Sequence, residues 1–144
     1  MSDRPPFGVR TALTADVAPC AALWARAQQE IEPRVPPWRA SDFEDEVNGE
    51  ELFVAHAGPE VVGLLSLWRA EAFVHFLHVA PAWRRRGVGR QLLTAARAEI
   101  DRPLELKCLT DNSRALAFYQ RLGWIALKRD LDPPAPYVRL RQPR

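Results

Sequence analysis

An apolar strand runs through a basic, glycine-containing turn and directly into a helix at residues 77–92. The turn at residues 84–90 reads Arg-Arg-Arg-Gly-Val-Gly-Arg. Because glycine lacks a Cβ atom, Gly87 and Gly89 let the backbone bend tightly and bring consecutive N–H groups toward one ligand. The helix that begins there adds unpaired N–H groups and the positive end of its dipole. The segment therefore predicts a binding site for an anion such as a pyrophosphate.

The size of the chain predicts a single domain over residues 1–144. A chain of 144 residues can bury roughly 68–70% of its unfolded surface without a metal or a disulfide. A net charge of +2 is too small to indicate nucleic-acid binding by itself. Cys20 and Cys108 lie far apart within apolar stretches, so we expect reduced, buried thiols, which fits a cytoplasmic protein.

Three kinds of signal are missing from the sequence. Residues 1–8 have no apolar core for a signal peptide, and no run approaches the ~18 apolar residues of a membrane helix. His56, His75 and His78 do not have metal-ligand spacing, so no bound metal is expected. The glycine turn lacks the third glycine of a dinucleotide fingerprint, where Leu92 stands, and the Gly-Lys-Ser/Thr of a P-loop.

Hydrophobic periodicity predicts alternating strands and helices along the whole chain. Thr14 should cap the first helix, and Ser41 with Glu44 forms a capping box for the second. The proline-rich loop between them, at residues 33–37, is a candidate lid or substrate wall. The expected strands span residues 9–13, 52–57, 61–69, 72–79, 104–109, 124–128 and 137–140, and two later helices begin at Gly87 and at Asp111 or Asn112.

These elements predict an α/β (α+β) fold with the order β-α-α-β-β-β-α-β-α-β-β. The three strands between residues 52 and 79 read as an antiparallel meander. The strand, helix and strand around Gly87 should form a parallel, right-handed crossover. The result is a mixed, mostly antiparallel sheet of about seven strands with helices on both faces.

A second motif follows the first by about twenty residues, at residues 111–124: Asp-Asn-Ser-Arg-Ala-Leu-Ala-Phe-Tyr-Gln-Arg-Leu-Gly-Trp. It is similar to the Asn-x-x-Ala-x-x-Tyr-(x)3-Gly-aromatic block of the GNAT superfamily of acyl-CoA-dependent N-acetyltransferases. Arg84-x-x-Gly87-x-Gly89 resembles the signature with which that family holds the pyrophosphate of acetyl-CoA. The resemblance covers nearly the whole chain.

The resemblance implies transfer of an acetyl group from acetyl-CoA to a primary amine of a small molecule or peptide, by direct attack in a ternary complex. The strand backbone before the turn would pair with the pantetheine arm, in a gap that the family leaves between this strand and the next. Backbone N–H groups of the turn would bind the pyrophosphate and stabilise the oxyanion. The expected cofactor-binding residues are Leu77, His78, Val79, Arg84, Arg85, Arg86, Gly87, Val88, Gly89, Arg90 and Asn112.

Tyr119 matches the tyrosine of the second motif and is the candidate general acid for the departing thiolate. A free phenol has a pKa near ~10 and a cysteine-like thiol near ~8.5, so position matters as much as acidity. The alternative is an aromatic side chain packed in the core.

His75 is the candidate general base, since members of the arylalkylamine type carry a histidine there and imidazole titrates near neutral pH. A purely structural histidine fits equally well. On a regular strand Phe73, His75 and Leu77 share one face, so His78 should point away from the amine with Val74 and Phe76. Glu71, Glu30 and Glu32 are reserve bases acting through water.

The acceptor is not fixed by any motif. Relatives that acetylate protein N-termini often have a glutamate where this chain has Lys107, which favours another amine. Acidic residues at 30–46 form a candidate wall for a cationic amine, or simply a solvated helix face: Glu30, Glu32, Asp42, Glu44, Asp45 and Glu46. Trp38, Trp68 and Phe43 are candidates for its apolar lining.

Two rival functions remain on the sequence alone. A non-catalytic acyl-CoA-binding regulator would have the same fold and motifs. A nucleic-acid module would use the arginines of the turn, although no aromatic residues interleave them. By analogy with dimeric family members, the strand pair at the C-terminal end is a candidate homodimer contact.

Overall fold

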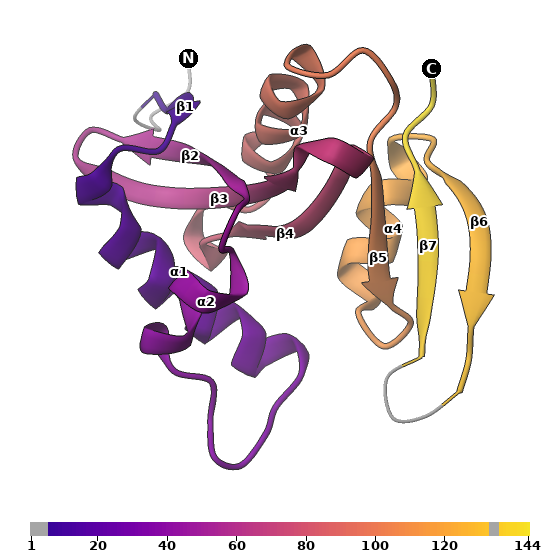
Figure 1. The fold of residues 1–144 in the computed structure, drawn as a ribbon, viewed down its shortest axis with the longest axis horizontal. Helices are drawn as coiled ribbons and strands as arrows, with labels where there is room; N and C mark the ends of the chain where they lie inside the picture. The colour runs from indigo at the N-terminus through magenta and orange to yellow at the C-terminus, as the bar shows by residue number, and fades with distance from the viewer. Residues whose placement is uncertain (1–5, 133–135) are drawn as a thin grey trace.

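The computed structural model describes residues 6–132 and 136–144. Residues 1–5, which begin the segment without a signal-peptide core, and residues 133–135 lie outside the described part. The described residues form one seven-stranded sheet with the order β1-β2-β3-β4-β5-β7-β6 (Figure 1). Its strands are β1 (Gly8–Thr11), β2 (Glu51–Ala57), β3 (Glu60–Trp68), β4 (Phe73–Val79), β5 (Glu105–Leu109), β6 (Ile125–Asp130) and β7 (Tyr137–Arg141).

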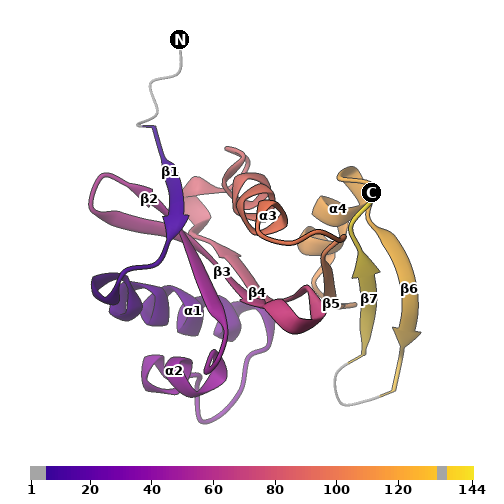
Figure 2. The ribbon, with the colours of Figure 1, turned by 45° about the horizontal axis from the view of Figure 1, so that its top comes forward.

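Helices cover both faces of this sheet (Figures 1 and 2). On one face lie α1 (Val17–Ile31) and the short α2 (Phe43–Glu46), and on the other lie α3 (Val88–Ala98) and α4 (Ser113–Arg121). Every neighbouring strand pair is antiparallel except β4 and β5, which are parallel across the α3 crossover. The predicted fold class, element order and parallel pairing of β4 with β5 are confirmed.

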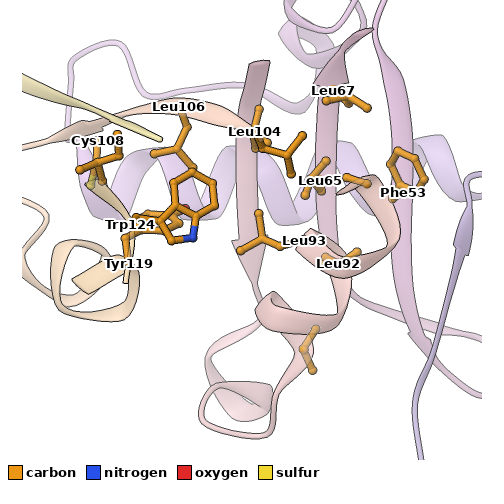
Figure 3. Packing of buried hydrophobic residues seen from close by; sticks show 14 of the residues in the cluster. Phe53, Leu65, Leu67, Leu92, Leu93, Leu104, Leu106, Cys108, Tyr119 and Trp124 are labelled. Atoms are coloured by element: carbon orange, nitrogen blue, oxygen red, sulfur yellow. The ribbon is translucent and has the colours of Figure 1, made fainter. Parts of the chain in front are cut away.

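Each face of the sheet has its own apolar core. Helix α3 buries Val88, Leu92, Leu93 and Ala96 at helical spacing against the strands, as Figure 3 shows for its leucines beside Leu65. The opposite face packs α1 and α2 in a second cluster that includes Cys20, Trp24, Phe43 and Leu64. Full burial of each such large side chain contributes about 1.5–3 kcal/mol, so β2 and β3, which contribute residues to both cores, are stabilised from both faces.

The predicted caps of the first two helices are wrong. Thr14 lies in a 3-10 turn before α1, where the carboxylate of Asp16 instead accepts the N–H of Leu13 at 2.7 Å. Asp16 also pairs with Arg10 on β1, so this carboxylate ties the start of the helix to the sheet. Ser41 likewise lies in a 3-10 turn, and no side-chain cap hydrogen bond closes α2. Both α-helices therefore begin after a 3-10 turn, at Val17 and Phe43, without a side-chain cap.

A β-bulge in β4 overturns the predicted alternation of side chains. Ser66 pairs with Phe76 and the next residue of β3, Leu67, pairs with Val74, so His75 is the extra residue. An inserted residue reverses the face on which the following side chains lie. Val74 therefore packs in the α3 core, whereas Phe76 packs against α1.

Candidate functional site

A cavity of about 230 Å³ lies where β4 and β5 diverge. Parallel pairing joins the two strands only at Phe73 with Glu105 and Val74 with Leu106. In the described part of the chain no strand pairs with the β5-facing edge of β4 from His75 onward. The cavity is lined by Gln28, Ile31 and Glu32 of the α1 end, residues 74–78 of β4, residues 106–109 of β5, and Asn112, Ala115 and Tyr119.

The turn before α3 has the geometry of an anion cradle. Arg85 and Gly87 both have positive φ angles, of 62° and 81°. The first helical hydrogen bond runs from the N–H of Gln91 to the carbonyl oxygen of Gly87, at 3.0 Å. The N–H groups of Val88, Gly89 and Arg90 precede that bond and are therefore available at the helix end. These donors, together with the helix dipole, fit a pyrophosphate.

The two glycines of the turn serve different purposes. A Cβ at Gly87 would meet no atom within 4 Å, so its need for glycine comes from its backbone angle. At Gly89 a Cβ would lie 3.2 Å from Cζ of Phe118 on α4. Glycine there allows α4 to approach the start of α3 closely, which brings the second sequence motif beside the first.

Arg84 and Arg86 of the turn contact different partners. Arg84 lies 3.3 Å from the carboxylate of Glu30, which also accepts from Arg114 at 2.8 Å. Hydrogen bonds from Arg114 and then Arg84 hold the pKa of the Glu30 carboxyl below its usual value. This disfavours Glu30 as a reserve base and directs Arg84 toward α1. Arg86 stacks over the ring of Trp83 at 4.8 Å.

Asn112 caps α4 and lines the cavity. Its side-chain oxygen accepts the N–H of Ala115 at 3.3 Å, so Asn112 is the cap, in preference to Asp111. With its oxygen committed to the helix, the amide N–H₂ remains as a donor toward a ligand in the cavity.

Tyr119 is buried and also lines the cavity. Its ring packs against Phe118 and Trp124 with centroids 5.1 Å apart in each pair, and Figure 3 shows Tyr119 beside Trp124. Burial raises the pKa of Tyr119 above that of a free phenol, and Cys108 on β5 adds to the rise. The phenol is therefore kept protonated at neutral pH, which is the state that an acid requires.

Two histidines line the cavity from β4, although the sequence predicted that they face apart. His75 stacks on Phe76 with centroids 3.9 Å apart, and its Nδ1 lies 2.8 Å from the Glu50 carboxylate. His78 is buried, with Nε2 3.0 Å from the amide oxygen of Gln28 on α1. Burial lowers the pKa of His78 to about 4, and the positive charge of Arg84 contributes. His78 is therefore neutral at pH 7.

The predicted acidic wall is largely absent from the cavity. Of its six carboxylates, only Glu32 lines the cavity, and Glu44, Asp45 and Glu46 are exposed on α2. Asp42 lies 3.8 Å from both Arg34 and Arg39. These contacts favour the solvated-face alternative for most of the segment. Glu71 is exposed in the turn before β4 and also does not line the cavity.

The aromatic residues predicted for the acceptor wall do not line the cavity either. Phe43 is fully buried in the α1 and α2 core, and Trp68 is exposed at the end of β3. Trp38 donates its indole N–H to the Glu32 carbonyl at 2.8 Å and folds the proline-rich loop back onto α1. Lys107 does line the cavity, with its Nζ 4.8 Å from the ring centre of Tyr137.

Comparison with known proteins agrees with this geometry. The model of the acetyltransferase (GNAT) family matches residues 17–124. The chain belongs to the GNAT acetyltransferase family. An uncharacterised protein of Mycobacterium leprae is 32% identical over 136 residues, which are 85% of this chain and 36% of that protein. The chain thus spans about a third of that relative's length.

A second relative is spanned over most of its length. N-alpha-acetyltransferase RimI of Mycobacterium tuberculosis is 30% identical over 142 residues, with 89% of this chain and 85% of RimI covered. Among solved structures, Escherichia coli YjaB superposes with a TM-score of 0.73 at 23% identity, covering 95% and 97% of the two chains. Salmonella typhimurium yncA, a putative acetyltransferase solved with acetyl-CoA, has a TM-score of 0.68 at 17% identity, covering 94% and 92%.

Acetyl-CoA is bound in the yncA structure, whose fold this GNAT domain shares. Within residues 6–132 and 136–144, no cluster of three or more His, Cys, Asp or Glu side chains is placed to hold a metal ion. Cys20 and Cys108 are free and buried, as predicted. None of the described helices is long and apolar enough to span a bilayer.

Sequence reasoning missed three side chains at or behind the GNAT cavity. Gln28, Glu50 and Ser66 contact His78, His75 and the bulge of β4 respectively. Gln28 and Glu50 are 50 and 25 residues from the histidines that they contact. The available signal was weak: only Ser66 is a polar residue between two apolar neighbours, which indicates burial with a partner and does not identify that partner.

Proposed function

We propose that this GNAT domain transfers an acetyl group from acetyl-CoA to a primary amine of a small molecule or peptide, by direct attack in a ternary complex. The observation that carries the proposal is that one cavity between β4 and β5 is lined by Tyr119, His75 and Asn112 together. These residues supply a candidate acid, a candidate base and a candidate cofactor contact. A protein that only binds acyl-CoA would need the cofactor contact but neither the acid nor the base.

Cofactor grip is assigned to backbone groups. The N–H groups at the start of α3 would bind the pyrophosphate, and the unpaired edge of Leu77, His78 and Val79 would hydrogen-bond the pantetheine arm as a neighbouring strand does. Arg85 and Arg90 are exposed and add positive charge around the pyrophosphate. The same backbone donors are the candidates for stabilising the oxyanion.

In the proposed reaction one proton moves from nitrogen to sulfur. His75 takes a proton from the attacking amine as the C–N bond forms. The C–S bond of the tetrahedral intermediate then breaks, and the thiolate takes the phenolic proton of Tyr119. Exchange with solvent returns His75 and Tyr119 to their starting states, so that the net products are an amide and free CoA.

Two classes of acceptor amine fit the proposal: a peptide N-terminus and the primary amine of a small molecule. RimI is named for acetylation of an α-amino group, which supports a peptide N-terminus as acceptor here. Lys107 stands where N-terminal acetyltransferases often carry a glutamate, and its positive charge beside the cavity opposes a cationic amine. Glu32 is the one residue of the predicted acidic wall at the cavity and would attract that amine.

Release of CoA tests the proposal directly. The purified protein is incubated with acetyl-CoA and each member of an amine panel, and free thiol is measured. The panel contains a peptide with a free N-terminus, the same peptide with a blocked N-terminus and one lysine, an arylalkylamine and a polyamine. We expect thiol release that depends on one of these amines. Binding of acetyl-CoA without amine-dependent release would favour the non-catalytic regulator. Failure to bind acetyl-CoA, with salt-dependent binding to DNA or RNA, would favour the nucleic-acid module.

A further inference from the structure

We infer that Glu50 is a positioning residue that fixes the tautomer of His75, so that Nε2 of this imidazole is the proton acceptor at the cavity. The inference rests on the proposed acetyltransfer and adds a residue that neither sequence motif contains. It concerns a pair that joins the residue before β2 to the bulge of β4.

The turn after α2 delivers Glu50 to this position. The N–H of Glu50 donates to the Val47 carbonyl at 2.9 Å, and Gly49 between them has a φ of 80°. The side chain of Glu50 is only 7% exposed, and its Oε2 lies 2.8 Å from Nδ1 of His75. The turn at residues 47–50 thus places the Glu50 carboxylate within hydrogen-bond distance of Nδ1 of His75.

The bulge of β4 presents His75 to that carboxylate. His75 is the extra residue opposite the Ser66 and Leu67 step of β3. The N–H of Phe76 donates to the buried hydroxyl of Ser66 at 3.0 Å, which replaces a missing ladder bond. The imidazole then stacks on the Phe76 ring, so it is braced on one side by an aromatic ring and at Nδ1 by Glu50.

The chemistry of the pair assigns the proton. An ionised carboxylate accepts hydrogen bonds and donates none, so the neutral imidazole must carry its proton on Nδ1. Nε2 then holds a free lone pair. A base acting through Nε2 needs this tautomer, and an imidazole without a partner would divide its population between the two forms.

Stability alone does not account for a carboxylate at position 50. Its second oxygen, Oε1, is buried without a hydrogen-bond partner in the part of the chain that the structure describes. A buried carboxylate with incomplete pairing is costly, and an apolar side chain of similar size would avoid that cost. The hydrogen bond of this carboxylate to Nδ1 of His75 accounts for a charged side chain at this position.

The experiment combines NMR with kinetics on the full chain. Long-range ¹H–¹⁵N correlation at pH 8 identifies the tautomer of His75, whose signals are assigned by their loss in His75→Gln. We expect a protonated Nδ1 and an unprotonated Nε2 in the wild type, and a mixture in Glu50→Gln. With the acceptor amine that the CoA-release assay identifies, kcat of Glu50→Gln should fall on the order of 10-fold with little change in KM. Once His75 is Gln, the same change should alter kcat by less than about twofold.

Glu51→Gln is the matched control, since Glu51 is the adjacent carboxylate and pairs with Arg69 at 2.6 Å, away from the cavity. It should leave the tautomer and kcat unchanged. A wild-type tautomer protonated on Nε2, or equal losses of kcat from Glu50→Gln with and without His75, would overturn the inference while leaving acetyltransfer intact. Absence of amine-dependent CoA release by the wild type would instead overturn the proposed function, and the catalytic role of Glu50 with it.

Discussion

At the scale of single residues, Tyr119 combines burial with a place on the cavity wall. Replacing it with phenylalanine keeps the ring packing on Phe118 and Trp124 and removes only the hydroxyl. If the phenol protonates the thiolate, kcat should fall by about 10²- to 10⁴-fold, and the Kd for acetyl-CoA should stay nearly constant. Tyr137→Phe is the control, because Tyr137 lies on β7 outside the cavity lining. Unchanged turnover in Tyr119→Phe would remove the acid assignment.

His78 predicts how stability depends on pH. Its pKa is lowered from 6.5 to about 4, so between these values the unfolded chain binds the proton and the folded chain does not. The free energy of unfolding therefore has its full contribution from His78 above pH 6.5 and loses it as the pH falls toward 4. The loss amounts to about 3 kcal/mol. Urea unfolding at pH 7 and pH 4.5 should show a smaller decrease in His78→Gln than in the wild type. Parallel decreases would contradict the assignment.

At the scale of elements, the turn before α3 offers a test that separates backbone strain from ligand binding. Gly87→Ala places a side chain at a φ of 81°, which costs roughly 1–2 kcal/mol and shifts the N–H groups of the cradle. Gly58→Ala imposes a similar strain, at a φ of 58° in the β2–β3 turn. Calorimetry should show weakened acetyl-CoA binding only in Gly87→Ala. Equal affinity in both variants would place the cradle elsewhere.

The same turn explains why much of the site could be predicted from sequence. The positive φ of Gly87 and the Asn112 cap depend on only a few residues of the chain, so their signals are local, whereas the contact of Gly89 with Phe118 is not. The bulge at His75 could not be predicted, because an extra residue exists only relative to the partner strand β3. The cap at Thr14 failed for a local reason, since α1 begins only at Val17, with Asp16 at the N-cap position and no side-chain cap.

At the scale of the whole molecule, acetyl-CoA should stabilise the fold by binding along an unpaired strand edge. A ligand at 100 times its Kd raises the free energy of unfolding by about 2.7 kcal/mol, and each kcal/mol shifts the Tm of a chain this size by about 2–4 °C. A rise in Tm of about 5–10 °C is therefore expected at saturation. Free CoA should give much of this shift and acetate none. No shift with acetyl-CoA would count heavily against the cofactor assignment.

The pairing of β4 with β5 through only two residue pairs divides the sheet into a four-stranded and a three-stranded part. Acetyl-CoA bound between the two parts would supply hydrogen bonds along the edge of β4 that does not pair with β5. The lifetime of the protein in a cell would then depend on the concentration of the CoA cosubstrate, acetylated or free, because proteases cleave mainly opened chains.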